Sequence, residues 1–206
     1  MIVIIDYGIG NLGSVVNALD KLGIKNQISS SPSVIKKANA LILPGVGTAR
    51  QGMENLRERN LDKVIIGDIQ KGKPFLGICL GMQLLFERSE EGKVPCLGIY
   101  EGIVKKFTKE KKVPQIGWNS VKYGDQKNQN VNRLFKNIPD NSYFYFVNSY
   151  YCLPSDRSII AGGCRYGEKF ASVVAKDNVI GVQFHPEKSG KVGFTLLKNF
   201  IKNYAN

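Results

Sequence analysis

The most informative segment of this 206-residue sequence reads Pro74-Phe75-Leu76-Gly77-Ile78-Cys79-Leu80-Gly81. Its apolar run predicts a buried strand over Pro74–Ile78, and the leucine-rich residues that follow predict a helix from Leu80 to about Arg88. Cys79 would then lie on a sharp turn within a G-x-C-x-G pattern, the thiol counterpart of a nucleophile elbow. A buried, inert cysteine is the default interpretation of any single cysteine, but it explains neither flanking glycine.

The preceding residues repeat the same order of strand and helix. Apolar runs predict strands over Met1–Asp6, Ile24–Ile28 and Ala40–Leu43, the last ended by Pro44. Apolar residues at helical spacing predict helices over Leu12–Leu22, Arg50–Arg59 and Leu61–Lys71. Strands that alternate with helices indicate right-handed βαβ units and a parallel sheet.

The second half of the chain is rich in strands. Residues 97–123 are strand-like but broken by glycine and proline, and further strands are predicted over Tyr143–Tyr151, Ile159–Cys164, Phe170–Ala175 and Val179–Phe184. A helix over Ser189–Tyr204 follows. We therefore expect an α/β fold with three α/β/α layers, a mainly parallel central sheet and an antiparallel extension. Residues 1–206 are expected to form one domain, because no repeat or linker interrupts them.

The composition excludes several classes of protein. No apolar run approaches the length of a membrane span, and Met1–Asp6 lacks the basic leader of a signal peptide, so a cytoplasmic location with no membrane partner is expected. The net charge of +12 is spread over the chain. Its densest cluster, around Lys105–Lys112, is typical of a solvated hairpin or loop, and we expect no nucleic-acid partner.

Four cysteines and one histidine leave little for a metal site. Cys79, Cys96, Cys152 and Cys164 are not at metal-ligand spacing, and a cytoplasmic protein rarely has structural disulfides. No metal and no cofactor are predicted.

A glycine-rich segment near the N-terminus offers a competing hypothesis. Gly8-Ile9-Gly10-Asn11-Leu12-Gly13 matches the G-x-G-x-x-G of dinucleotide-binding turns, between a strand and a helix. The acidic residue that would hold the ribose is missing from Gln27–Ser31. A tight packing turn explains the same glycines, so an NAD(P)-binding protein remains only a distant alternative.

The elbow needs a base and an oxyanion site. A helix N-terminus favours thiolate at Cys79, and the backbone N–H of Leu80 would face an oxyanion. His185, the single histidine, follows a predicted strand, and Glu187 could orient its ring. The turn Leu43-Pro44-Gly45-Val46-Gly47 could aim further N–H groups at a negative charge, although an ordinary βα turn explains it equally well.

These segments, P-G-V-G, G-I-C-L-G-M-Q-L-L and Q-F-H-P-E, resemble the class I (triad) glutamine amidotransferases. The sequence is most similar to the glutaminase subunits of imidazole glycerol phosphate synthases. The similarity covers nearly the whole chain, including Asp6–Leu12, Gln115–Asn119, Tyr143–Val147 and Lys188–Gly190.

The resemblance implies that Cys79 attacks the side-chain amide of glutamine, that His185 relays protons and that Glu187 orients His185. It assigns the oxyanion donors to Leu80 and to Gly45, Val46 and Gly47, the latter after a peptide reorients on complex formation. Substrate contacts are implied for Gln83, Glu91, Ser149 and Tyr150.

The resemblance also implies a partner, a (β/α)₈-barrel cyclase subunit that uses the ammonia to make imidazole glycerol phosphate and aminoimidazole carboxamide ribonucleotide in histidine biosynthesis. The residues expected at that interface are Asn11, Trp118, Tyr145, Asn148 and Lys188.

Two residues depart from the family pattern. The chain has Gln115 and Asn148 where the family usually has histidine. Both lie near the expected docking face, so a related glutaminase that feeds a nucleotide-sugar amidotransferase, for acetamidino sugars of surface glycans, is the second hypothesis. A thiol peptidase of related fold and a catalytically inactive scaffold are further alternatives.

Overall fold

A mixed β-sheet runs through the centre of the computed structural model, which describes residues 1–110, 112–125 and 129–205. Its strand order is β2-β1-β3-β4-β13-β12-β10-β7-β5-β6. The strands from β2 to β13 pair in parallel. They are β1 (Ile2–Ile5), β2 (Asn26–Ser29), β3 (Ala40–Gly45), β4 (Phe75–Cys79) and β13 (Val179–Val182).

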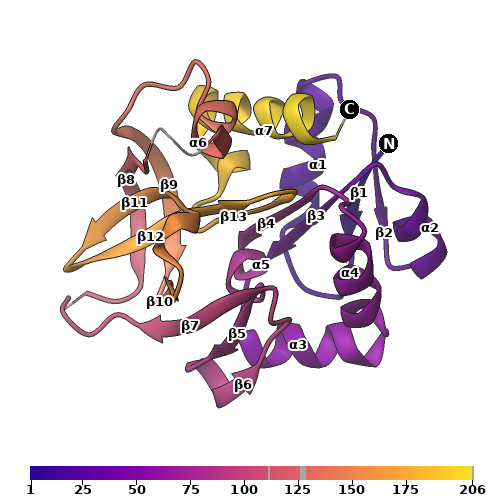
Figure 1. Cartoon of the computed structure of the whole chain (residues 1–206), viewed down its shortest axis with the longest axis horizontal. Helices are drawn as coiled ribbons and strands as arrows, with labels where there is room; N and C mark the ends of the chain where they lie inside the picture. The colour runs from indigo at the N-terminus through magenta and orange to yellow at the C-terminus, as the bar shows by residue number, and fades with distance from the viewer. Residues whose placement is uncertain (111, 126–128, 206) are drawn as a thin grey trace.

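The antiparallel extension follows on the far side of β13 (Figure 1). It contains β7 (Tyr100–Lys106), β10 (Tyr150–Pro154), β11 (Ile160–Tyr166) and β12 (Glu168–Lys176). The short strands β5 (Phe86–Ser89) and β6 (Val94–Pro95) form its edge. A ribbon of β8 (Gln115–Tyr123) and β9 (Ser142–Asn148) branches off through β11.

Helices cover both faces of the parallel strands. The residues of β1 alternate between two apolar cores, with Ile2 and Ile4 in one and Val3 and Ile5 in the other. The first core includes residues of α1 (Leu12–Lys21), α6 (Gln129–Leu134) and α7 (Gly190–Tyr204). The second includes residues of α2 (Pro32–Lys37), α3 (Ala49–Glu58), α4 (Leu61–Gln70) and α5 (Leu80–Gln83). The predicted α/β/α layers and mainly parallel sheet are therefore confirmed.

Some predicted boundaries are wrong. The helix expected from Leu80 to about Arg88 ends at Gln83, because Phe86–Ser89 pairs with β7 as a strand. Pro44 does not end β3, which continues to Gly45. The range Tyr143–Tyr151 contains parts of two strands, and the short helices α2 and α6 were not predicted.

The predicted lysine cluster lies at the end of β7 and in the loop that follows it. Lys105 and Lys106 end β7, and Lys109 lies in the loop after it, while Lys111 falls outside the described residues. Within the described part of the chain, no helix is long and apolar enough to cross a membrane.

Candidate active site

Cys79 occupies the turn between β4 and α5 in a backbone conformation that is unusual for a residue with a side chain. Its φ is 54° and its ψ is −108°. Such a conformation is strained, and strain of this kind is concentrated at functional sites. A Cβ at Gly77 would lie 2.5 Å from the carbonyl oxygen of Gly81, and a Cβ at Gly81 would lie 1.8 Å from that of Leu43. The turn can therefore form only with glycine at both positions.

Parallel pairing brings three segments to one edge of the sheet. Val182 pairs with Ile78, so β13 delivers His185 next to the turn. Gly45 pairs with Cys79 itself, so the P-G-V-G segment lies on the other side of it. The carboxyl ends of parallel strands are the usual place for a ligand crevice.

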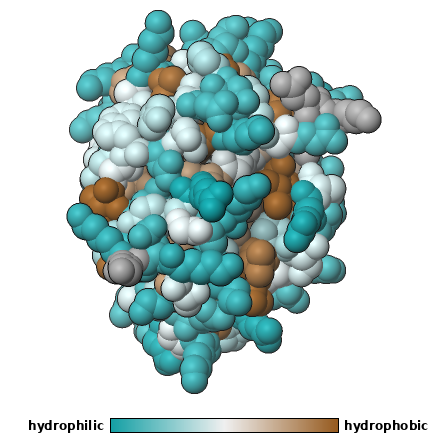
Figure 2. All heavy atoms as spheres, turned by 90° about the vertical axis from the view of Figure 1, so that its left-hand side faces the viewer, coloured by the Kyte–Doolittle hydropathy of each residue, from teal (hydrophilic) through white to brown (hydrophobic). Residues whose placement is uncertain are grey.

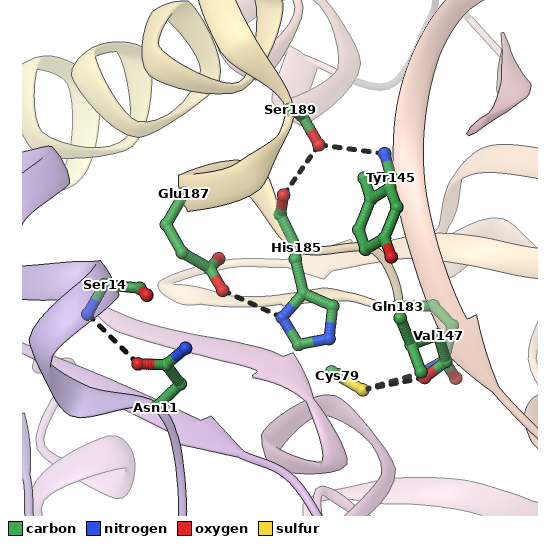
Figure 3. A network of polar contacts seen from close by, with 9 residues as sticks. All are labelled: Asn11, Ser14, Cys79, Tyr145, Val147, Gln183, His185, Glu187 and Ser189. Atoms are coloured by element: carbon green, nitrogen blue, oxygen red, sulfur yellow. Dashed lines mark hydrogen bonds and ion pairs between the residues drawn. The ribbon is translucent and has the colours of Figure 1, made fainter. Parts of the chain in front are cut away.

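The imidazole of His185 lies between a carboxylate and the thiol (Figure 3). Its Nδ1 is 2.8 Å from Glu187 Oε1, and both side chains are almost completely buried. Ser189 Oγ donates to the carbonyl of His185 and accepts from the backbone N–H of Tyr145, which fastens the histidine segment to β9.

His185 lies in surroundings that favour its charged form. Burial lowers its pKa, but the interactions with the Cys79 sulfur and the Glu187 carboxylate outweigh burial and raise the pKa to about 10. These interactions favour the imidazolium, the form that His185 takes when it accepts the proton of the Cys79 thiol. Because α5 is a single turn, its dipole contributes less to this site than a long helix would.

Two further groups contact the thiol. Cys79 Sγ donates to the carbonyl of Val147 at 3.7 Å, and Gln183 Nε2 donates to Sγ at 3.7 Å. Gln183 Oε1 in turn accepts from Gln83 Nε2 at 3.0 Å. Gln183 was seen in the sequence only as part of Q-F-H-P-E. Its contact with a cysteine 104 residues away depends on strand pairing, so no local sequence pattern predicts it.

Burial keeps the three other cysteines in their thiol form. Burial raises the pKa of Cys96 to about 11 and that of Cys164 to about 12, and it raises the pKa of the fully buried Cys152 well above its usual range. All four cysteines are free thiols. These three thiols stay protonated at neutral pH, and none of them lines the cleft above Cys79.

A cleft of about 290 Å³ opens above Cys79, which is small for a ligand site and suits a molecule of amino-acid size. Its lining combines most of the expected catalytic and substrate residues with two of those expected at an interface. The lining residues are Val46, Gly47, Cys79, Leu80, Gln83, Glu91, Pro114, Val147, Asn148, Ser149, Tyr150, His185 and Lys188.

The four residues expected to contact substrate, Gln83, Glu91, Ser149 and Tyr150, all line this cleft. Gln83 Nε2 donates to the carbonyl of Tyr150, which also accepts from Asn148 Nδ2. Glu91 Oε2 accepts from the backbone N–H of Ala49 at 2.8 Å. Burial raises the pKa of Glu91, and the Ala49 hydrogen bond opposes that shift.

The remaining expected residues lie outside the cleft. Gly45 does not line it and lies next to the Tyr7 hydroxyl. Asn11 caps α1 by accepting from the N–H of Ser14 (Figure 3). Trp118 is 56% exposed and its ring meets that of Tyr145 edge-on, with the centroids 6.0 Å apart.

The glycine-rich N-terminal turn is used for packing. Gly8 and Gly10 have φ values of 86° and 122°, which favour glycine. A Cβ at Gly8 would lie 2.8 Å from Arg59 Nη2 on the segment after α3. Among the described residues, no cluster of three or more His, Cys, Asp or Glu side chains could hold a metal ion.

Sequence comparison places the chain among known proteins. The pattern of the family Glutamine amidotransferase class-I matches residues 3–204. The imidazole glycerol phosphate synthase subunit HisH of Dehalococcoides mccartyi strain CBDB1 is 47% identical over 204 residues, which cover 98% of this chain and 97% of the relative. The imidazole glycerol phosphate synthase subunit HisH 2 of Pseudomonas aeruginosa is 46% identical over 205 residues, which cover 98% and 99%.

Solved structures with low sequence identity share the fold. A crystal structure of a glutamine amidotransferase superposes with a TM-score of 0.74 at 18% identity, covering 97% of each chain. The structure of PurLQS from Thermotoga maritima gives a TM-score of 0.75 at 16% identity, covering 98% of this chain and 97% of the other.

Proposed function

Because the chain belongs to the class I glutamine amidotransferase family, we propose that it is the glutaminase subunit of an imidazole glycerol phosphate synthase. The observation that carries this proposal is the pairing of Cys79, on a strained turn, with His185 in one small cleft. Near-half identity to HisH subunits over almost the full length supports the choice of pathway.

In the proposed reaction, the Cys79 thiol passes its proton to His185, and the resulting thiolate attacks the amide carbon of the glutamine side chain. A C–S bond forms, and the carbonyl oxygen becomes an oxyanion. The His185 imidazolium gives its proton to the nitrogen as the C–N bond breaks, which releases ammonia and leaves a γ-glutamyl thioester. His185 then takes a proton from water, whose oxygen displaces the sulfur and releases glutamate. Glu187 orients the ring and stabilises its charge throughout.

The walls of the cleft would supply the remaining contacts. The backbone N–H of Leu80 follows the nucleophile directly and can meet the oxyanion, with Val46 or Gly47 as the second donor. Gln83, Glu91 and the backbone at Ser149 and Tyr150 would hold the polar groups of glutamine, for which the half-buried Glu91 carboxylate suits the α-ammonium.

The ammonia would pass to a (β/α)₈-barrel cyclase subunit bound at the β8–β9 ribbon. Large apolar side chains of this ribbon are exposed, with Ile116 63%, Trp118 56% and Tyr143 60% accessible. Hydrophobic patches interrupt the hydrophilic surface on the side that carries the antiparallel extension (Figure 2). Exposed apolar surface of this kind marks protein interfaces. Tyr145 and Asn148 belong to β9 of this ribbon, and Asn148 and Lys188 line the cleft. These three residues and Asn11 would join the interface. The proposed location is the cytoplasm.

Replacement of the nucleophile tests the proposal. In the complex with the cyclase, Cys79→Ala should lower glutamine-dependent synthesis by about 10³-fold or more, while synthesis from free ammonium continues. Cys96→Ala is the matched control, because Cys96 is a free thiol outside the cleft, and it should behave like the wild type. Glutamine hydrolysis by Cys79→Ala would refute the assignment.

One observation favours a second candidate, a glutaminase that supplies a nucleotide-sugar amidotransferase. The two departures from the family pattern, Gln115 and Asn148, are direct partners across the β8–β9 ladder. Both are buried, and their side-chain oxygens have no hydrogen-bond partner among the described residues. Paired changes in the wall beside the partner surface suit a different partner. The test is which synthase stimulates glutamine hydrolysis; stimulation by the sugar-modifying enzyme and not by the cyclase would select this candidate.

A further inference from the structure

The hydroxyl of Tyr7 is a buried donor that the resting structure does not use. The side chain is 0% exposed, and its Oη has no hydrogen-bond partner among the described residues. Burial, with a further contribution from the nearby Cys79, raises the pKa of this phenol well above its usual range, so it stays protonated. Buried hydroxyls almost always have a partner, and an exception calls for an explanation.

Tyr7 Oη lies directly against the segment expected to form the oxyanion site. A Cβ at Gly45 would lie 2.3 Å from Oη and 2.8 Å from the Cβ of Leu80. The hydroxyl therefore fills the space between the end of β3 and the start of α5. Asn55 Nδ2 donates to the backbone carbonyl of Tyr7 at 2.8 Å, which fixes the residue that carries the ring.

The hydroxyl of Tyr7 lies next to Gly45 but outside the lining of the cleft. Val46, Gly47 and Leu80 line the cleft, whereas Gly45 and the fully buried Tyr7 do not. In a trans peptide the N–H and the preceding C=O point in opposite directions. When the N–H of Val46 faces an oxyanion in the cleft, the carbonyl of Gly45 faces away from it. Tyr7 Oη, which lies next to Gly45 and outside the cleft lining, is a candidate donor to that carbonyl.

We infer that Tyr7 is a positioning residue for the oxyanion site. Its hydroxyl donates to the Gly45 carbonyl when the Gly45–Val46 peptide turns the Val46 N–H into the cleft, and this hydrogen bond stabilises that orientation. Among the described residues Oη has no acceptor, so we assign this hydrogen bond to the working state and not to the resting one. The inference rests on the proposed glutaminase function.

The test is Tyr7→Phe in the complex with the cyclase subunit. The loss of one neutral hydrogen bond from the working state should lower kcat for glutamine hydrolysis about five- to tenfold. KM should stay within about twofold, because Tyr7 does not line the cleft. The melting temperature should not fall, because the removed hydroxyl has no partner at rest.

Tyr100→Phe is the matched control. Tyr100 is also buried, but its hydroxyl donates to the carbonyl of Val179 at 2.7 Å, far from the cleft lining. This variant should lower the melting temperature and leave kcat unchanged. A Tyr7→Phe enzyme that melts earlier with an unchanged kcat, or that shows wild-type behaviour throughout, overturns the inference.

Failure of this inference is distinguishable from failure of the proposed function. If Cys79→Ala is inactive and Tyr7→Phe hydrolyses glutamine at the wild-type rate, only the role of Tyr7 is wrong. If Cys79→Ala still hydrolyses glutamine, the proposed function itself is wrong.

Discussion

The parallel strands and the β8–β9 ribbon bury their apolar residues to different extents. In β1 and β3, apolar side chains are buried on both faces, as in Val3, Ile4, Leu41 and Ile42, which have no exposed surface. In the ribbon, inward residues such as Phe144 and Phe146 alternate with outward apolar ones. The helices of the chain thus bury the apolar side chains of the parallel half, whereas the ribbon has an exposed apolar face that a partner surface would bury.

The two regions meet at Cys79. The parallel half supplies the turn that holds the thiol, and β9 supplies the Val147 carbonyl that accepts from it. Asn148, at the end of the same strand, lines the cleft. A partner that contacts the outer face of the ribbon would therefore act on the strand whose end forms one wall of the cleft.

The largest effect is expected from breaking the close packing of the parallel half. Gly81→Ala places a Cβ against the Leu43 carbonyl and should lower the free energy of unfolding by about 3 kcal/mol. Denaturant unfolding measures this change. Gly67→Ala, in α4 with no atom near its added Cβ, is the control and should stabilise the protein by about 0.5–1 kcal/mol. Equal stability of Gly81→Ala and wild type would contradict the packing argument.

Trp118→Ala should weaken partner binding and leave stability nearly unchanged, unlike Gly81→Ala, because the Trp118 side chain is mostly exposed. We expect the free energy of unfolding to change by less than about 0.5 kcal/mol. Binding of the cyclase subunit should weaken about thirtyfold, or about 2 kcal/mol, as for a buried aromatic anchor. Titration calorimetry measures the affinity.

Leu153→Ala provides the control for Trp118→Ala. Leu153 is an exposed apolar residue of β10, outside the ribbon, and its replacement should leave cyclase binding unchanged. Equal weakening by both variants would show that the ribbon is not the docking surface.

The smallest effect is a shift of pH dependence at the point where the two regions meet. The interactions with Cys79 and Glu187 raise the pKa of His185 to about 10, so its proton is available below that pH and is lost as the pH rises through it. Glu187→Gln removes a charge that raises this pKa. The alkaline limb of the rate profile should move down by about one pH unit. Glu168→Gln, a control carboxylate that accepts from Tyr151, should leave the limb in place. An unmoved limb in Glu187→Gln would contradict the role of Glu187.

The same contrast explains what could be predicted from the sequence. Apolar runs and glycine spacing were sufficient to predict the strands of the parallel half and the turn at Cys79, because local residues determine them. The stretch from Leu84 to Arg88 also had a helical pattern, but pairing of Phe86–Ser89 with β7 prevailed over that local preference.

Contacts between segments that are distant in the sequence could not be predicted from it. The amide of Gln183 at the thiol and the hydroxyl of Tyr7 behind Gly45 are positioned by the register of β13, β4 and β3. No periodicity in one segment encodes that register. His185 could be found because it is the single histidine of the chain, follows a predicted strand and lies in Q-F-H-P-E.

The most direct test of the central claim is covalent labelling of the complex with a diazo-oxo-norleucine, a glutamine analogue that alkylates a nucleophilic cysteine, followed by peptide mass spectrometry. The account predicts one label per chain, on Cys79, with Cys96, Cys152 and Cys164 unmodified because burial keeps them protonated. A label on any of the other three cysteines, or no label while glutamine is being hydrolysed, would contradict it.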